Sequence, residues 1–189
     1  MADFKDEKRS NATHQSTTAP ESRLMRKGNG QPARLSYSGH VLMENRDELC
    51  VDILITESIQ TEHRAARPLL TRARRRHIHP ETLGALKGYH VKAFVEHQVR
   101  PHIARIKDRK TPGLDGRTTR TKRYLVSQRK RKRVEEILGW LKTVGGLRKA
   151  RFIGHAKTQM AAFISGAAYT QGHCIYTSCS CLIPSIAIL

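Results

Sequence analysis

Two stretches of the chain near residue 40 alternate apolar side chains with small or polar ones. A repeat of two residues is typical of strands that bury one face. The segment ENRDE, residues 44–48, separates the two stretches and supplies turn residues. The pattern therefore predicts a β-hairpin with one buried face, whose apolar positions are Leu35, Tyr37, Val41 and Met43, followed by Leu49, Val51, Ile53 and Ile55.

Helical and extended patterns alternate after the hairpin. Residues 61–76 have a helical pattern, which Pro68 should kink or split because proline removes a backbone donor and clashes with the preceding turn. A short strand should end at Gly84 to Leu86. Further along, the pattern predicts a helix over 91–99, a short strand over 101–106, a basic loop over 107–123, a helix that begins near 126 and stops at Gly145-Gly146, and a last helix over 157–169. Strands that come first and then alternate with helices indicate the α/β class.

Composition divides the chain into three parts. Residues 1–33 are polar and predict a loop or a partly ordered arm. Residues 34–169 carry the strand and helix patterns of a folded domain. Residues 170–189 are atypical, since cysteines, serines and apolar residues replace the charges found elsewhere, as in a segment translated in a shifted frame.

The net charge of +19 makes nucleic acid the leading partner. Such an excess of cations repels itself unless a polyanion offsets it. An anionic membrane surface is the second interpretation, and a merely soluble basic protein is the third. The sequence contains no run of 18 apolar residues, so it predicts no membrane span. The charged start MADFKDEKRS does not have the pattern of a secretory signal.

The helix predicted from residue 126 places carboxylates inside a strongly basic segment. At about 100° per residue, Arg131 lies near −40° and Lys142 near −20° when Glu135 is set to zero. These three residues form one polar stripe beside the apolar face, whereas Glu136 points about 100° away towards solvent. Two interpretations of the stripe are open. Arg131 and Glu135 form an ordinary ion pair on the helix surface, or the Glu135 carboxylate reaches into a cleft.

Several motifs resemble those of bacterial insertion-sequence transposases with an IS4-like DDE domain. The spacing R-x3-E-x6-K of Arg131, Glu135 and Lys142 is similar to the signature around the last catalytic acid of these enzymes. Gln128 stands where the broader signature has tyrosine. The segments EKRSNATHQSTT, GHVLMENR, DGRTTR and VSQRKRKRVEEILGWLKTVGGLRKARF resemble the same family, in the same order, over roughly residues 4–169.

The resemblance implies an RNase H-like fold, a mixed sheet flanked by helices, that acts on double-stranded DNA in the bacterial cytoplasm. In the family, three acids hold two Mg²⁺ or Mn²⁺ ions that assist in-line phosphoryl transfer. Glu135 corresponds to the third acid and would be both a catalytic residue and a metal ligand, with Arg131 and Lys142 orienting it or touching DNA phosphate. No small-molecule substrate and no membrane partner are expected.

This chain departs from the family pattern at the other two acids. Leu86 occupies the position of the second aspartate, and His90 stands at a nearby acidic position. Leucine has no atom that can bind a metal. The family's first strand, with its aspartate, precedes the point at which this chain begins, so the fold is expected to be incomplete, with an unpaired edge inside the sheet. Asp52, Glu81, Asp108 and Asp115 are weak substitutes because metal geometry is exacting.

The expected function is therefore that of a truncated, catalytically inactive transposase. The alternatives are a DNA-binding protein that modulates transposition, with full-length transposase as a candidate partner, and a relic that does not fold stably. Two metal-like patterns, His77 with His79 and the cysteines of the tail, are read as a basic surface loop and an irregular segment. The residues expected to bind DNA phosphates are Arg117, Arg120, Lys122, Arg123, Arg129, Lys130, Lys132, Arg133, Arg148, Lys149 and Arg151.

Overall fold

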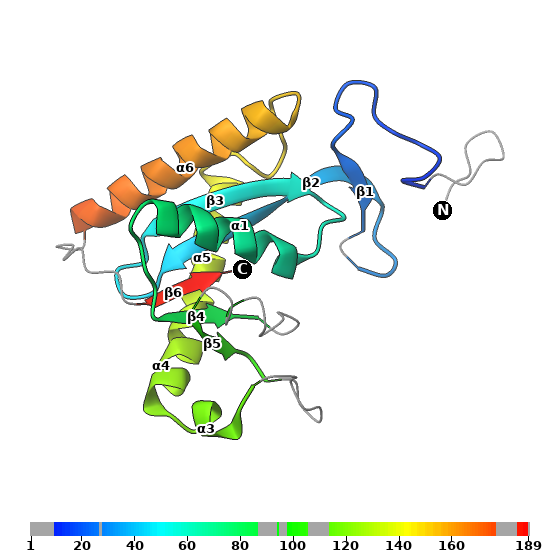
Figure 1. Cartoon of the computed structure of the whole chain (residues 1–189). Coiled ribbons are helices and arrows are strands. Elements are labelled where there is room, and N and C mark those ends of the chain that lie inside the picture. The colour runs from blue at the N-terminus through cyan, green and yellow to red at the C-terminus, as the bar shows by residue number, and fades with distance from the viewer. Residues whose placement is uncertain are drawn as a thin grey trace.

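The computed structural model describes residues 10–26, 28–86, 94, 98–105, 114–176 and 185–188 of the chain. Its architecture is a six-stranded mixed sheet with helices on both faces (Figure 1). The strands are β1 (Arg23–Met25), β2 (Arg34–Glu44), β3 (Cys50–Glu57), β4 (Thr82–Ala85), β5 (Arg100–Ile103) and β6 (Ser185–Ile188). The helices are α1 (Glu62–Arg75), α3 (Gly116–Thr119), α4 (Lys122–Lys130), the 3-10 turn η1 (Arg131–Arg133), α5 (Val134–Thr143) and α6 (His155–Tyr176). The α/β class expected from the sequence is thus found.

The predicted hairpin is formed by β2 and β3, which pair antiparallel from Tyr37↔Glu57 to Met43↔Cys50. The expectation of a single buried face is wrong. Val41, Leu42 and Met43 are consecutive, and all three are fully buried. Because neighbouring side chains of a strand point to opposite faces, both faces of the hairpin must be covered.

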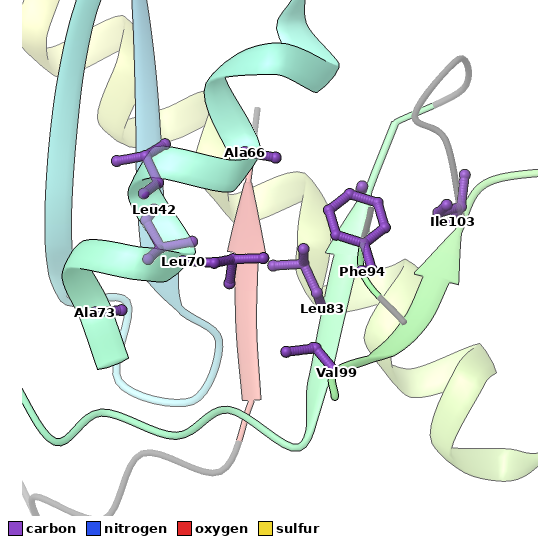
Figure 2. Packing of buried hydrophobic residues seen from close by; sticks show 10 residues of the cluster. Leu42, Ala66, Leu70, Ala73, Leu83, Phe94, Val99 and Ile103 are labelled. Carbon is purple, nitrogen blue, oxygen red and sulfur yellow. The ribbon is translucent and has the colours of Figure 1, made fainter. Parts of the chain in front are cut away.

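Two apolar cores lie on the two faces of the sheet. The first joins α1 to the strands, and Figure 2 shows Ala66, Leu70 and Ala73 of the helix with Leu42 and Leu83 of the strands. The second joins the other face to α5 and α6. Its buried members are Val41, Met43, Ile53, Ile55, Val134, Ile137, Leu141 and Ala162.

Helix α1 runs from Glu62 to Arg75 with Pro68 inside it, so the predicted split does not occur. An interior proline costs about 3 kcal/mol. Burial of a leucine side chain returns about 2 kcal/mol, and α1 buries both Leu69 and Leu70 completely against the sheet. Tertiary packing therefore offsets the local penalty.

Helix α6 lies along the outer edge of β3 (Figure 1). The amide of Gln159 donates to the carbonyl of Ile53 at 2.9 Å and accepts from the N–H of Ile55 at 2.8 Å. The Thr170 hydroxyl accepts from the N–H of Cys50 at 3.1 Å. An open strand edge is a template for unwanted pairing, and these polar side chains satisfy it. The last predicted helix is confirmed, and it continues without a break across residue 170 to Tyr176.

The strand β6 occupies the middle of the sheet. It pairs antiparallel with β2, with Met43 opposite Ala187, and parallel with β4, with Gly84 opposite Ala187. The sequence predicted an unpaired edge at this place, but the C-terminal strand fills it. The physical reason is that backbone donors and acceptors in the interior need partners.

Two further segments differ from the sequence-based expectation. Residues Arg23–Met25 of the predicted arm form β1, which pairs antiparallel with the start of β2. The predicted basic loop over 107–123 contains α3 and the first turn of α4, while residues 106–113 lie outside the described part of the chain. The helix predicted over 91–99 also falls largely outside it. No helix in the described part is long and apolar enough to cross a membrane.

Candidate functional site

A nearly continuous helical rod made of α4, η1 and α5 crosses the face of the sheet that lies opposite α1. At its start, the Tyr124 hydroxyl donates to the carbonyl of Ile103 on β5 at 2.9 Å. Its middle passes over β4, where a Cβ placed on Gly84 would lie 3.6 Å from the Cβ of Arg131. Its end packs Val134 and Leu141 into the core on β2 and β3. The rod therefore carries the signature residues across the sheet.

Arg131 is part of the interior of this packing rather than of the surface. Only 9% of the residue is exposed. Its Nε donates to the side-chain oxygen of Gln128 at 3.3 Å, and the Gln128 amide in turn donates to the carbonyl of His102. Its Nη1 atom is buried without a hydrogen-bond partner. Gln128 thus takes a structural role at the position where the resemblance expects tyrosine, and Arg131 is not placed to touch a DNA phosphate.

Glu135, Glu136 and Lys142 are all exposed on α5. The expected difference between a carboxylate at the core's edge and one in solvent is therefore not seen. In the part of the chain that the structure describes, no ion pair joins Arg131 to Glu135, because the Arg131 side chain is buried and its Nε donates to Gln128. The apolar face predicted for this helix is confirmed by Val134, Ile137 and Leu141.

Leu86 follows β4 directly and packs against the core beneath α1. His90 lies outside the described residues. Within the described ranges, no group of three histidine, cysteine, aspartate or glutamate residues is arranged to hold a metal ion. A site for two hard divalent ions needs several carboxylates that meet. The described residues do not fit such a site, because Leu86 at the strand end has no ligand atom and Glu135 is exposed without a second carboxylate in a described metal-binding group.

The other acids considered as substitutes have different partners. Asp52 is buried on β3 and bound by Arg72 and Arg76. Asp115 accepts from the N–H of Arg117 at 2.9 Å and caps α3. Glu81 lies 3.9 Å from Arg123. Asp108 lies outside the described residues.

A small group of buried polar atoms lies between the rod and the strands β4 and β5. His102 is 1% exposed, and both its ring nitrogens lack a hydrogen-bond partner. The Ser127 hydroxyl is likewise buried and unpaired, and it lies 3.2 Å from a Cβ placed on Gly84. Burial lowers the pKa of His102, and the positive charges of Arg100 and Arg123 lower it further. His102 is therefore a neutral, desolvated imidazole next to two cations.

The basic residues predicted to bind DNA are mostly exposed. On α4 and η1, Lys122, Arg129 and Lys132 lie opposite the buried side chains Tyr124 and Ser127. At about 100° per residue, these cations form a stripe on the outer face of the rod. Nine of the eleven are exposed, namely Arg117, Arg120, Lys122, Arg123, Arg129, Lys132, Arg148, Lys149 and Arg151.

The remaining two predicted DNA contacts, Lys130 and Arg133, are half-buried. Arg133 forms an ion pair with Glu48 in the turn between β2 and β3, which reduces its charge towards an outside partner. In the run of arginines from 72 to 76, Arg72 and Arg76 bind Asp52. The number of basic residues in a stretch of sequence is therefore larger than the number that can contact an outside partner.

An open hollow of about 210 Å³ lies at the end of the molecule formed by α3, α4 and the start of β5. We call it the arginine hollow. Its lining residues are Arg100, Arg117, Thr118, Thr121 and Arg123. Sequence reasoning missed Arg100, because a single arginine before a short strand carries no signal of its own. Only the fold brings it to the arginines of the DGRTTR segment and the residues that follow.

Other candidate groups have ordinary structural roles. The ring of Trp140 packs edge-on against Tyr169 with 5.5 Å between centroids, so it is not a free stacking surface. His77 and His79 are exposed, and neither belongs to a metal-binding group in the described ranges. Burial raises the pKa of the Cys50 thiol to about 12, which makes it unreactive.

Comparison with known proteins adds one match. A protein-family model described as a transposase DDE domain matches residues 7–171. No curated protein and no solved structure was found to match the chain.

Proposed function

This chain belongs to the family of transposases with a DDE domain, and from that premise we propose that it binds double-stranded DNA without cutting it. The family acts on DNA in transposition. The observation that carries the proposal is the basic stripe of the rod, where exposed Lys122, Arg129 and Lys132 follow one another along a single face. Cations arranged in this way contact successive phosphates and read no sequence.

An RNase H-like arrangement of the sheet belongs to the same proposal. The pairing order β3, β2, β6, β4, β5 supports it, with β2 and β3 antiparallel and β4 and β5 parallel. In this order the C-terminal strand takes the central place that the resemblance gives to a first strand. The relation to an IS4-like group, and cooperation with a full-length transposase, remain part of the proposal and rest on the motifs alone.

Binding to DNA is tested by titrating duplex affinity against salt concentration. We expect the logarithm of the association constant to fall linearly with the logarithm of the salt concentration, by about 0.9 for each phosphate contacted. Replacing Lys122, Arg129 and Lys132 together by glutamine should reduce the slope by about 3, if each contacts one phosphate. A chain whose affinity does not change with salt would contradict DNA binding through this stripe.

A matched control removes an equal charge elsewhere. Arg64, Arg67 and Arg75 lie on α1, on the opposite face of the sheet, and all three are exposed. Replacing them by glutamine lowers the net charge by the same amount but should leave the slope within about 1 of the wild-type value. If the two triple variants reduce the salt slope equally, net charge alone attracts the chain to DNA.

Loss of strand cutting is tested with supercoiled plasmid DNA in the presence of Mg²⁺ or Mn²⁺. We expect no nicked or linear product above a protein-free control, because the described donors do not make a site for two metals. Glu135→Gln is the control variant, since Glu135 matches the third acid of the family signature. Metal-dependent nicking that disappears in this variant would overturn the proposal of an inactive copy.

A further inference from the structure

The arginine hollow combines three guanidinium groups from three separate elements. Arg100 begins β5, Arg117 belongs to α3 and Arg123 belongs to the first turn of α4. The hydroxyl residues Thr118 and Thr121 complete the lining. Among the described residues, no aromatic ring lines it. The guanidinium groups are donors for an oxyanion. The Thr121 hydroxyl is already used as the cap of α4, because it donates to the carbonyl of Thr118 at 2.8 Å and accepts from the N–H of Tyr124 at 3.2 Å.

The carboxylates near the hollow do not neutralise it. Glu81 lies 3.9 Å from Arg123, and Asp115 lies 3.1 Å from Arg117, and both acids are exposed. Ion pairs between exposed groups are weak and exchange readily with other partners. In the described part of the chain, no carboxylate forms an ion pair with Arg100. The hollow therefore keeps an excess of positive charge.

A second observation concerns His102, a buried residue on the same strand as Arg100. His102 follows Arg100 by two positions on β5, so both side chains are on the face of the sheet that α4 covers. The ring of His102 lies edge-on to Tyr124 of α4, with 5.6 Å between centroids. Both of its nitrogens are buried and unpaired. Two arginines thus lie next to a desolvated imidazole with no described carboxylate paired to Arg100, an arrangement that an anion would stabilise.

We propose that the arginine hollow binds a single phosphate group of the DNA backbone. The inference rests on the proposed DNA-binding function and assigns Arg100, Arg117 and Arg123 to one phosphate. Arginine suits this task because its planar donors can contact two phosphate oxygens at once. The hollow then fixes the duplex at one point, while the stripe on the rod supplies further phosphate contacts.

The test follows the His102 ring by NMR in the chain of residues 1–189. Burial, Arg100 and Arg123 each lower the pKa of this imidazole, and a bound phosphate would offset the two arginines. Addition of a short duplex should therefore shift the ring resonances and raise the pKa of His102. Arg100→Gln should remove the shift and reduce the salt slope of DNA binding by about 0.9. Arg123→Gln is a second variant at an independent lining position and should have the same effect.

The control variant is Arg148→Gln, an exposed arginine beyond α5 that does not line the hollow. It should leave the DNA-induced shift of His102 in place. Wild-type protein that binds DNA while the His102 resonances stay unchanged would overturn the inference but not the proposed function. Absence of DNA binding at every salt concentration would overturn both.

The source of the phosphate is distinguished by two further additions. Inorganic phosphate alone at the same phosphate concentration should shift His102 less than the duplex, because the rest of the DNA adds contacts. A duplex with a 5′-phosphate and one without it should act equally if an internal phosphodiester is bound. A shift that requires the terminal phosphate, or that only inorganic phosphate produces, would contradict the binding of an internal backbone phosphate.

Discussion

Replacing Asp52 by asparagine is expected to lower the free energy of unfolding by about 3 kcal/mol. The Asp52 side chain is 2% exposed. Arg72 binds both its carboxylate oxygens, and Arg76 donates to Oδ2 at 2.6 Å. Arg72 also donates to the carbonyl of Ile53 at 2.9 Å and lies 5.4 Å from the ring centroid of Phe163. The carboxylate therefore joins β3 to α1, and its partner Arg72 also contacts α6.

The cost comes from the cations that the substitution leaves behind. Breaking a buried ion pair by removing one partner costs about 3–5 kcal/mol. The arginine side chains keep 31% and 48% of their surface exposed, so water recovers part of their hydration. The expected loss of unfolding free energy is therefore at the lower end of that range, about 3 kcal/mol. Chemical denaturation followed by circular dichroism measures it, and a cooperative transition would also show that the chain folds stably.

Asp115→Asn is the matched control for this prediction. Asp115 also pairs with an arginine, but that pair is exposed, and asparagine can replace aspartate as a helix cap. Asp115→Asn should lower the free energy of unfolding by about 0.5 kcal/mol or less. A triple replacement of Asp52 by leucine and of Arg72 and Arg76 by methionine should recover most of the stability that Asp52→Asn loses. An Asp52→Asn loss no larger than that of the control would contradict the assigned role.

Lowering the pH from neutral to about 4 is expected to destabilise the protein through His40 by about 3 kcal/mol. His40 is 2% exposed, and its Nε2 lies 2.9 Å from the hydroxyl oxygen of Thr56. Burial lowers its pKa from 6.5 to about 4. Below pH 6.5 the unfolded chain takes up a proton that the folded chain excludes. Stability is therefore fully present above pH 6.5 and falls as the pH approaches 4.

His40→Gln separates this contribution from the other effects of acid. The pKa of His102 is also lowered, so His102 contributes in the same direction. The large positive charge of the chain adds repulsion at low pH in every variant. The free energy of unfolding should fall less between pH 7 and pH 4 in His40→Gln than in the wild type, by about 3 kcal/mol. Parallel pH profiles for the two proteins would show that His40 does not titrate as described.

The two-residue and helical repeats of the sequence were enough to predict β2, β3 and α5, because each signal lies within one element. The short strand β4 was also predicted where it occurs, and the strand predicted over 101–106 overlaps β5, which begins at Arg100 and ends at Ile103. The expectation of one buried hairpin face was wrong, since the run Val41, Leu42, Met43 is apolar on both faces. A continuous apolar run indicates that both faces of a strand are buried. The alternating pattern in the rest of the strand predicted a single buried face instead.

What the sequence determined by itself is the family, the cationic character and the order of most elements. These depend on motifs and on neighbours a few residues apart. The tertiary structure alone decided which cations are available: Arg131 is buried and Arg72 is paired with Asp52, while Arg129 faces solvent. It also placed β6 between β2 and β4, and it gathered Arg100, Arg117 and Arg123 around one hollow. The physical reason is that burial and pairing depend on contacts between distant segments, which local patterns do not encode.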